Sequence, residues 1–478
     1  MNSKTVMICL EQLGIGGVET AVYNQAYTLK DKGYNVIVVA RSEIYKQKLE
    51  NYGIKCIDFE FALENKFDFE KAEMLENIMR ENDVCEVYIH QFPCILSAFL
   101  ACIKLKIPYV SYIHVGLLTE KDNVYDWFEK NFSIYKVAFK LFFENAYKII
   151  AITEYAADYN SQRYNIDKKK YIVINNSINF DLYNQNNLKN NNDNNYLING
   201  KFKAFLLITR ISNEKLTSIK NAIDFYISYC DKTNIIDAQL NILGDGDKIN
   251  EVKDYINKIN KKQYSIIFLG KSNDVTKYIK QSDIVLGLGR CILEAIVLRK
   301  LAIIAAYNGS VVLVKPNNID IASKNNFDGK NFNISFYDLL IEELIKLNNN
   351  TINDIVDNNY EYVYNNLNVK KNIYIINETK NFQENIDNYK SNLNCNFLYS
   401  IFDLENTNQK NIKLIYNMES KISDLNNSIN QKENENNYFK SEIDELEIKN
   451  KELSKELSNI YNSKRWKYAN KIAKIFKK

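Results

Sequence analysis

Residues 282–295 combine an apolar run, two glycines and an acid in a pattern suited to holding a phosphate. The apolar run predicts a buried strand, Gly287 and Gly289 predict a turn, and a helix is expected to start near Cys291. Free N–H groups and the positive end of the helix dipole face an anion at such a turn. Glu294, in the first turn of that helix, is placed to reach a ribose hydroxyl. We therefore expect a nucleotide to bind here.

Two cations follow a second apolar run, Ala204–Thr209, which also predicts a strand. Arg210 stands at the end of this strand and Lys215 lies just beyond it, so both side chains can reach a cleft at the sheet edge. Arginine offers a planar fork to phosphate and lysine a point charge, and together they can replace a metal ion. The alternative is a pair of ordinary surface cations.

Three glycines, Gly14, Gly16 and Gly17, come directly after the first predicted strand and open a helix. Without a Cβ, their backbone can closely approach a phosphate or a second substrate. The spacing Gly-x-Gly-Gly differs from the dinucleotide fingerprint, and the second strand ends in Ala40 and Arg41 without an acid. A dehydrogenase is therefore disfavoured.

The sequence offers little for a metal site. Asp245 and Asp247 flank a glycine between a strand and an amphipathic segment, so Asp247 is expected to be a helix N-cap instead of a metal ligand. The eight cysteines form no C-x-x-C pair and there are two histidines, which excludes a Cys/His zinc cluster and fits reduced thiols in a cytosol. No carboxylate pair with glycosidase spacing stands out. We expect no metal and no cofactor.

Short apolar runs alternate with amphipathic segments through the first 180 residues. This repeated strand–helix pattern predicts a parallel sheet covered on both faces. The strand candidates are Val6–Leu10, Val36–Ala40, Lys55–Asp58, Glu86–His90, Tyr109–Ile113, Ile149–Ile152 and Tyr171–Ile174.

A second strand–helix series follows an Asn-rich segment with eight Asn at positions 184–195. That segment predicts a linker or loop, and the second series predicts another doubly wound domain with a cleft between the two. Its strand candidates are Ala204–Thr209, Ala238–Leu243, Ser265–Leu269, Ile284–Leu286 and Ala302–Ala305, with helices near 218–230, 248–260, 274–280 and 291–299.

The last hundred residues change character. Heptads run from Ile415 to Ile460 with 11 of 14 a and d positions apolar, which predicts a coiled coil. Asn436 and Asn450 at a positions favour a parallel dimer, and the alternative is one long helix docked on the body. Seven basic residues and no acid follow from Lys464 onward, against 55 basic and 59 acidic residues in the rest of the chain. We expect this tail to bind anionic lipid as an amphipathic helix.

Targeting and domain organisation follow from the same composition. The N-terminus lacks the pattern of a signal peptide, and no apolar run reaches the roughly 20 residues of a membrane span, so we expect a cytoplasmic protein. The body is near neutral, which argues against nucleic-acid binding. The expected units are 1–183 (first doubly wound domain), 184–199 (linker or loop), 200–334 (second doubly wound domain), 335–390 (helices packing back), 411–462 (coiled coil) and 463–478 (basic tail).

These features resemble the GT-B glycosyltransferases of family 4, which are retaining enzymes that use nucleotide sugars. Leu13–Thr20 (LGIGGVET) matches that family's Gly-Gly-x-Glu loop, and Thr209–Lys215 matches its G-R-x-x-x-x-K pattern. Residues 282–295 match its E-G-F-G-x-x-x-x-E-A signature, and Tyr171–Asn179 is similar to its V-I-P-N-G-I-D strand end with Pro, Gly and Asp replaced. Asn326–Lys330 (NFDGK) is similar to the N-F-S-G-R motif of a bacterial branch.

The resemblance implies roles for individual residues and one departure. His114 matches a cleft histidine that contacts the sugar, and the first signature acid, which commonly binds the donor sugar, is replaced by Leu286. Arg290 is a candidate to compensate for that loss. The expected catalytic residues are His114, Arg210 and Lys215, and the expected donor-binding residues are Gly16, Gly17, Gly289, Arg290, Cys291 and Glu294.

The resemblance thus implies a bacterial glycosyltransferase that moves a sugar from a nucleotide-sugar donor to a cell-surface glycan or lipid-linked acceptor. It also implies that domain 1–183 binds the acceptor and domain 200–334 binds the nucleotide sugar. Its expected partners are the nucleotide sugar, the acceptor, the inner membrane surface and a second copy of the chain. Two alternatives remain: a catalytically silent nucleotide-sugar binder or scaffold, motivated by Leu286, and a sugar-nucleotide epimerase, for which two histidines supply little acid–base chemistry.

Overall fold

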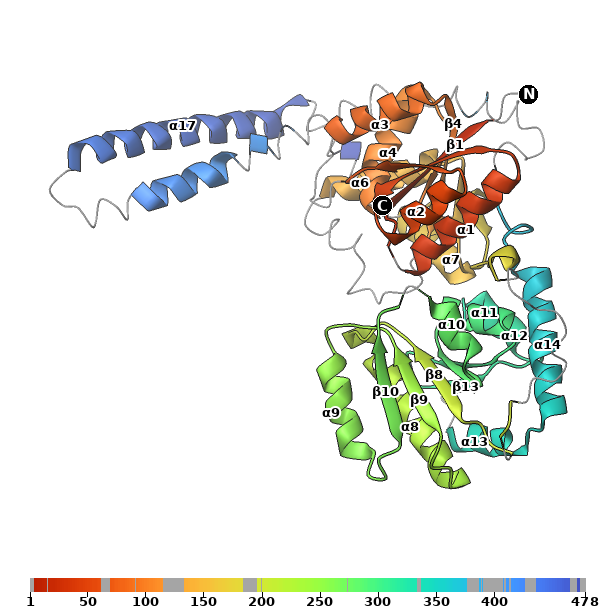
Figure 1. The fold of residues 1–478 in the computed structure, drawn as a ribbon. Coiled ribbons are helices and arrows are strands. Elements are labelled where there is room, and N and C mark those ends of the chain that lie inside the picture. Colours follow the sequence, from red (N-terminus) through yellow and green to blue (C-terminus); the bar gives the residue numbers. More distant parts are fainter. Residues whose placement is uncertain are drawn as a thin grey trace.

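The structure is a computed structural model of the 478-residue chain. It describes residues 4–14, 16–61, 69–90, 92–114, 133–183, 196–198, 200–272, 274–332, 337–375, 387, 389, 407, 410–411, 414–425, 436–464 and 471–472. Two sheets with helices on both faces form its two domains (Figure 1).

The first sheet is parallel throughout, with the order β3-β2-β1-β4-β5-β6-β7. Its strands are β1 (Thr5–Gln12), β2 (Asn35–Arg41), β3 (Lys55–Asp58), β4 (Val84–Ile89), β5 (Tyr109–Ile113), β6 (Lys148–Ala151) and β7 (Tyr171–Val173). Residues 5–10 of β1 are all buried, as expected for a strand covered on both faces. All seven predicted strands of this series are confirmed.

Alternate side chains of β1 enter two separate cores. Met7 and Cys9 pack with helices on one face, and Val6, Ile8 and Leu10 pack with helices on the other. The first face carries α3 (Phe69–Glu81), α4 (Phe92–Leu105), α6 (Ser133–Asn145) and α7 (Glu154–Tyr164), and the second carries α1 (Gly17–Asp31) and α2 (Ile44–Asn51).

The second sheet has the order β10-β9-β8-β11-β12-β13. Its strands are β8 (Ala204–Ile208), β9 (Gln239–Leu243), β10 (Ser265–Gly270), β11 (Ile284–Gly287), β12 (Leu301–Ala305) and β13 (Val311–Leu313). The five predicted strands are confirmed, and the additional three-residue β13 pairs antiparallel with β12 at the sheet edge. The helices are α8 (Leu216–Thr233), α9 (Ile249–Ile259), α10 (Val275–Lys280), α11 (Arg290–Val297), α12 (Ile319–Lys324), α13 (Tyr337–Lys346) and α14 (Asn349–Asn366). The predicted fold class of two doubly wound domains is therefore confirmed.

Two chain crossings join the domains. The first follows β7, and the second returns after α14, where Ile178 N–H donates to Leu367 O at 2.9 Å and Val369 N–H donates to Ile178 O at 3.0 Å. Ile375, beyond the second crossing, is buried in the core of the first domain. The described part of residues 335–390 thus packs on the second domain through α14 and returns to the first, in keeping with the prediction for this segment (Figure 1).

The expected linker, 184–199, extends too far. Residues 184–195 and 199 lie outside the described part of the chain. Tyr196 and Leu197 are buried in the second core, and the Tyr196 hydroxyl donates to Arg299 O at 2.8 Å. These two residues belong to the second domain because their apolar surfaces are removed from water there.

The predicted coiled coil appears as two helices, residues 414–425 and α17 (Asn436–Asn462), which lie side by side and antiparallel (Figure 1). Lys421 Nζ lies 3.5 Å from Glu442 Oε1, and Met418 and Ile443 are buried. Lys421 and Glu442 are 21 positions apart, and in one uninterrupted helix they would lie about 30 Å from each other. The heptad run is therefore not one straight helix, which corrects that part of the prediction, while the dimer stays a prediction.

The basic tail falls largely outside the description, because residues 465–470 and 473–478 are not among the described residues. Its predicted amphipathic helix therefore remains a prediction. Among the residues that the structure does describe, no helix is both long and apolar enough to cross a bilayer.

Candidate functional site

The turn between β11 and α11 is built from glycines for a steric reason. A Cβ on Gly287 would lie 2.4 Å from Cys291 Sγ and 2.9 Å from Ile208 O, so the start of α11 packs closely against the end of β8. Gly289 is the helix N-cap with φ of 65°, a conformation that favours glycine. The first amides of α11 have no acceptor within the helix, which leaves them available to an anion.

One amide expected to face that anion is already used. Gly289 N–H donates to Phe327 O at 3.2 Å. Asn326 and Phe327 both have left-handed backbone conformations, with φ of 53° and 55°. The chain therefore turns at these two residues, next to the glycine turn that Phe327 O contacts. Gly289 thus shapes the turn, and the amides that remain for a phosphate are those beyond it, of Arg290 and Cys291. The donor-binding role of Gly289 stays a prediction.

The segment that carries Arg210 is held by a second close approach. A Cβ on Gly244 would lie 1.8 Å from Thr209 O, and one on Gly246 would lie 2.0 Å from Ile211 O. Ile211 N–H donates to Asp245 O at 2.9 Å. The loops after β8 and β9 therefore lie against each other, and their glycines allow it. Asp247 is not an N-cap as expected, because Lys248 occupies that position of α9.

Lys215 reaches the start of α11, whereas Arg210 is exposed at the edge of the same loop. Burial raises the pKa of the Cys291 thiol to about 11, and the charge of Lys215 acts against that rise, which places the ammonium group near the helix start. The Ser212 hydroxyl, with smaller contributions from Arg210 and Lys215, lowers the pKa of Glu214. The ammonium group of Lys215 is thus close enough to the first turn of α11 to act on Cys291 electrostatically, and its role at a phosphate stays a prediction.

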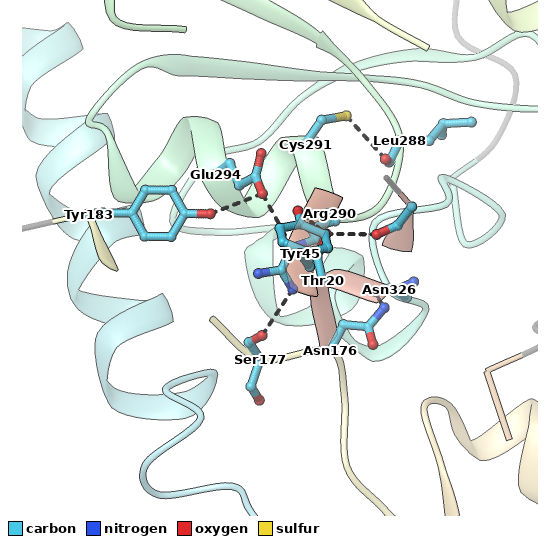
Figure 2. A network of polar contacts seen from close by, with 11 residues as sticks. Thr20, Tyr45, Asn176, Ser177, Tyr183, Leu288, Arg290, Cys291, Glu294 and Asn326 are labelled. Atoms are coloured by element: carbon cyan, nitrogen blue, oxygen red, sulfur yellow. Dashed lines mark hydrogen bonds and ion pairs between the residues drawn. The ribbon is translucent and has the colours of Figure 1, made fainter. Parts of the chain in front are cut away.

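Glu294 and Arg290 form a nearly buried ion pair on α11 (Figure 2). Arg290 Nε lies 3.2 Å from Glu294 Oε1, and the two side chains are 10% and 14% exposed. The Tyr183 hydroxyl donates to the same carboxylate oxygen at 3.0 Å, and Arg290 Nη1 donates to Ser177 O at 3.4 Å. Arg290 Nη2 is buried without a hydrogen-bond partner in the described part of the protein. The pair therefore retains one unused donor.

Thr20 and Tyr45 of the first domain lie beside this ion pair (Figure 2). Thr20 donates to Gly16 O at 2.7 Å and lies 3.1 Å from the Tyr45 hydroxyl. Burial raises the pKa of Tyr45, which also feels the charges of Arg290 and Glu294 across the domain boundary. A Cβ on Gly16 would lie 2.1 Å from a carboxylate oxygen of Glu19, whereas Gly17 has open space around it.

His114 lies elsewhere on the same domain boundary, at the end of β5. Its Nε2 is 2.9 Å from Nδ1 of His90, at the end of β4. Burial lowers the pKa of His114 to about 4, and burial together with His114 lowers the pKa of His90 well below its ordinary range. Both imidazoles are therefore neutral near pH 7.

Leu286, which stands in place of the first signature acid, is fully buried. Leu286 has no exposed surface, belongs to the second core and pairs with Leu207 of β8 and Ile303 of β12. An ionised carboxylate at this position would lose its hydration without a partner. The position thus serves the core of this protein.

The structure therefore brings together most of the predicted donor-side residues. Lys215, the α11 start and Glu294 lie on the second domain, and Gly16 belongs to the first-domain loop whose neighbours Thr20 and Tyr45 lie beside Arg290 (Figure 2). It adds four residues that were not among the predicted site residues: Tyr45, His90, Ser177 and Tyr183. Their partners are distant in sequence, and of the four only Ser177 lies in a recognised motif, the strand end 171–179. No group of three or more His, Cys, Asp or Glu residues among the described ones is arranged to hold a metal ion.

Solved structures share this two-domain architecture. A glycosyltransferase from Rickettsia africae ESF-5 superposes with a TM-score of 0.55 at 17% identity, over 82% of this chain and 99% of that protein. Anabaena HepE in complex with UDP and glucose superposes with a TM-score of 0.56 at 14% identity, over 77% and 96%. The HepE complex with UDP-glucose gives 0.55 at 14% identity, over 81% and 100%. No curated protein matches the chain in sequence.

The fold is thus that of the GT-B glycosyltransferases. Residues 15–182 match the sequence profile of Glycosyltransferase Family 4. The first domain therefore matches a Family 4 glycosyltransferase profile, and the chain shares its two-domain fold with glycosyltransferases of known structure.

Proposed function

We propose that this protein transfers a sugar from a nucleotide-sugar donor to a cell-surface glycan or lipid-linked acceptor, with retention and without a metal ion. The observation that carries the proposal is the convergence of Lys215, the free amides at the start of α11 and the Arg290–Glu294 pair opposite the Gly16 loop. The HepE complexes with UDP and with UDP-glucose support a uridine diphosphate sugar as the first donor to test.

The donor roles follow from charge. Loss of a nucleoside diphosphate releases negative charge on the phosphates, and fixed donors aimed at that charge accelerate the step. Lys215 and the amides of Arg290 and Cys291 bind the diphosphate, with Arg210 moving in from its exposed position. Glu294 accepts from the ribose hydroxyls. Arg290 supplies its unused Nη2 to the phosphate or to the sugar, in place of an acid at Leu286.

The carboxyl-terminal segments suggest where the reaction takes place. The basic tail binds the inner leaflet, which brings a cytoplasmic bacterial enzyme to lipid-linked acceptors. The helix 414–425 has 12 residues and α17 has 27, so part of α17 extends beyond the helix packed against it. The heptads in that part of α17 bind a second copy of the chain. These two assignments form part of the proposal.

A silent donor-binding protein is the second candidate. It is favoured by Leu286 in the core and by Arg290, whose guanidinium is already engaged by Glu294 and Ser177 O. Such a protein binds the nucleotide sugar but neither transfers nor hydrolyses it.

Binding and turnover measurements separate the two candidates. Purified full-length protein is titrated with UDP, UDP-glucose, UDP-galactose and GDP-mannose, and donor hydrolysis is followed with the best ligand. Lys215→Ala is expected to weaken nucleotide binding, since one charged hydrogen bond contributes about 1.5–3 kcal/mol. Lys220→Ala is the matched control, because Lys220 lies on α8 and pairs with Glu251 at 2.9 Å. Binding without turnover identifies the silent protein, and no binding by the wild type refutes both candidates.

A further inference from the structure

The start of α2 is tied to the glycine loop of the first domain. Leu13 N–H donates to Arg41 O at 3.0 Å, and Tyr45 N–H donates to Leu13 O at 3.0 Å. Two backbone hydrogen bonds thus hold the loop after β1 against the connection between β2 and α2. Tyr45, the second residue of α2, is placed by this connection at the domain boundary (Figure 2).

The hydrogen bonds at the Tyr45 hydroxyl can be assigned a direction. A threonine hydroxyl carries one hydrogen, and Thr20 donates its hydrogen to Gly16 O at 2.7 Å. The contact of 3.1 Å between Thr20 Oγ1 and Tyr45 Oη therefore uses the hydrogen of Tyr45. The Tyr45 oxygen keeps its lone pairs, so it can accept a hydrogen bond but has no further hydrogen to donate.

The ring of Tyr45 is held by stacking. It lies 4.8 Å from the ring of Tyr23 at an interplanar angle of 27°, and Lys48 Nζ lies 5.5 Å from its centroid. Tyr23 is buried, and its ring packs in turn 4.7 Å from that of Tyr27. Aromatic pairs of this kind contribute about 0.5–1.5 kcal/mol beyond the burial of their surfaces. The stack therefore fixes the ring of Tyr45 independently of its hydroxyl.

Arg290 lies beside Tyr45 across the domain boundary and has hydrogens to spare (Figure 2). Its Nε and Nη1 are engaged by Glu294 Oε1 at 3.2 Å and by Ser177 O at 3.4 Å. Its Nη2 carries two hydrogens, is buried, and has no hydrogen-bond partner in the described part of the protein. Burial raises the pKa of Tyr45 and the charge of Arg290 opposes that rise, which places the two groups near each other. An unpaired buried donor is thus close to an oxygen that can accept.

We propose that Tyr45 is a positioning residue for Arg290 in the donor complex. The Tyr45 oxygen accepts one hydrogen of Arg290 Nη2 and thereby directs the second hydrogen toward the diphosphate of the nucleotide sugar. Because a guanidinium is planar, one more contact in its plane fixes the direction of the remaining hydrogen. The inference rests on the proposed function, since it assigns the orientation of a cation in the same donor site.

The test removes the hydroxyl and keeps the ring. Full-length wild type, Tyr45→Phe and Tyr52→Phe are titrated by calorimetry with UDP or GDP, whichever binds better, and with the corresponding nucleoside, uridine or guanosine. Tyr52 is the matched control, because its ring stacks 4.0 Å from that of Tyr27 and its hydroxyl donates to Asp31. Tyr45→Phe is expected to weaken diphosphate binding about tenfold, the effect of losing one hydrogen bond from a charged donor, and to leave nucleoside binding unchanged.

A second arm asks whether the loss acts through Arg290. Arg290→Lys keeps the positive charge but lacks the Nη2 group that Tyr45 would direct. In the Arg290→Lys background, Tyr45→Phe is expected to change the affinity for the diphosphate less than twofold, whereas independent effects would again give about tenfold. A tyrosine that only supported the fold would weaken nucleoside and diphosphate alike and would keep its effect in that background.

The inference fails if Tyr45→Phe binds the diphosphate as wild type does, if it weakens the nucleoside by the same factor, or if its effect is undiminished in the Arg290→Lys background. Failure of the wild type to bind any nucleotide refutes the proposed function instead. A melting temperature close to that of Tyr52→Phe shows that Tyr45→Phe is folded.

Discussion

The Arg290–Glu294–Tyr183 network offers a prediction with two independent readouts. Glu294→Ala removes the carboxylate that accepts from Tyr183 at 3.0 Å and pairs with Arg290 at 3.2 Å. The side chain of Arg290 is 10% exposed in the wild type. Without the carboxylate, its remaining acceptor among the described contacts is Ser177 O at 3.4 Å. The substitution therefore perturbs both the second domain and the proposed ribose site.

The expected magnitudes differ for stability and binding. Breaking a buried ion pair by removing one partner costs about 3–5 kcal/mol, and the residual exposure of this pair places the loss near the lower end, about 3 kcal/mol. Loss of a charged hydrogen bond to the ribose costs about 1.5–3 kcal/mol, which is about 10- to 150-fold in the dissociation constant. Glu294→Gln keeps an acceptor oxygen for Tyr183 and is expected to lose less stability than Glu294→Ala.

Urea unfolding monitored by circular dichroism measures the first effect, and calorimetric titration with UDP measures the second. The double variant Arg290→Met/Glu294→Leu completes the test, since removing both charges relieves the isolated guanidinium and is expected to recover most of the lost stability. Unchanged unfolding in Glu294→Ala would refute the ion pair. Unchanged UDP affinity in Glu294→Ala, measured where the variant is folded, would refute the ribose role.

Three further predictions concern other parts of the site. Tyr183→Phe removes one hydrogen bond to the carboxylate and is expected to raise the donor KM about two- to tenfold at unchanged kcat, which steady-state kinetics would show; a fall in kcat alone would contradict it. The pKa of His114 is lowered from 6.5 to about 4, so the free energy of unfolding is expected to decrease by about 3 kcal/mol as pH falls from 6.5 toward 4. The melting temperature of His114→Asn should therefore decrease less steeply with falling pH than that of wild type. Equal slopes of melting temperature against pH would contradict this prediction. Gly287→Ala forces a Cβ to within 2.4 Å of Cys291 Sγ and is expected to cost about 1–3 kcal/mol, whereas Gly17→Ala, with open space, serves as the matched control in the same melts, and equal effects would argue against the tight turn.

The sequence by itself determined the architecture of the two domains. Strands covered on both faces need uninterrupted apolar runs, so twelve of the thirteen strands in the described sheets were predictable from such runs. The glycine turn before α11 was equally readable, because the start of a helix behind a buried strand leaves a local signature. β13, a three-residue strand that pairs antiparallel at the edge of the second sheet, was not predicted.

Tertiary structure decided which groups meet. Arg290 donates to Ser177 O across 113 positions of the chain, and Gly289 N–H donates to Phe327 O, a contact that no local pattern predicts. The antiparallel packing of helix 414–425 on α17 likewise replaced a single heptad run. Periodicity reports which face of an element is apolar, whereas the partner of that face depends on contacts between distant segments. A pocket lined by His90 and Gln25 is likewise formed by residues that become neighbours only when the strand ends of the first domain and the interdomain crossings come together.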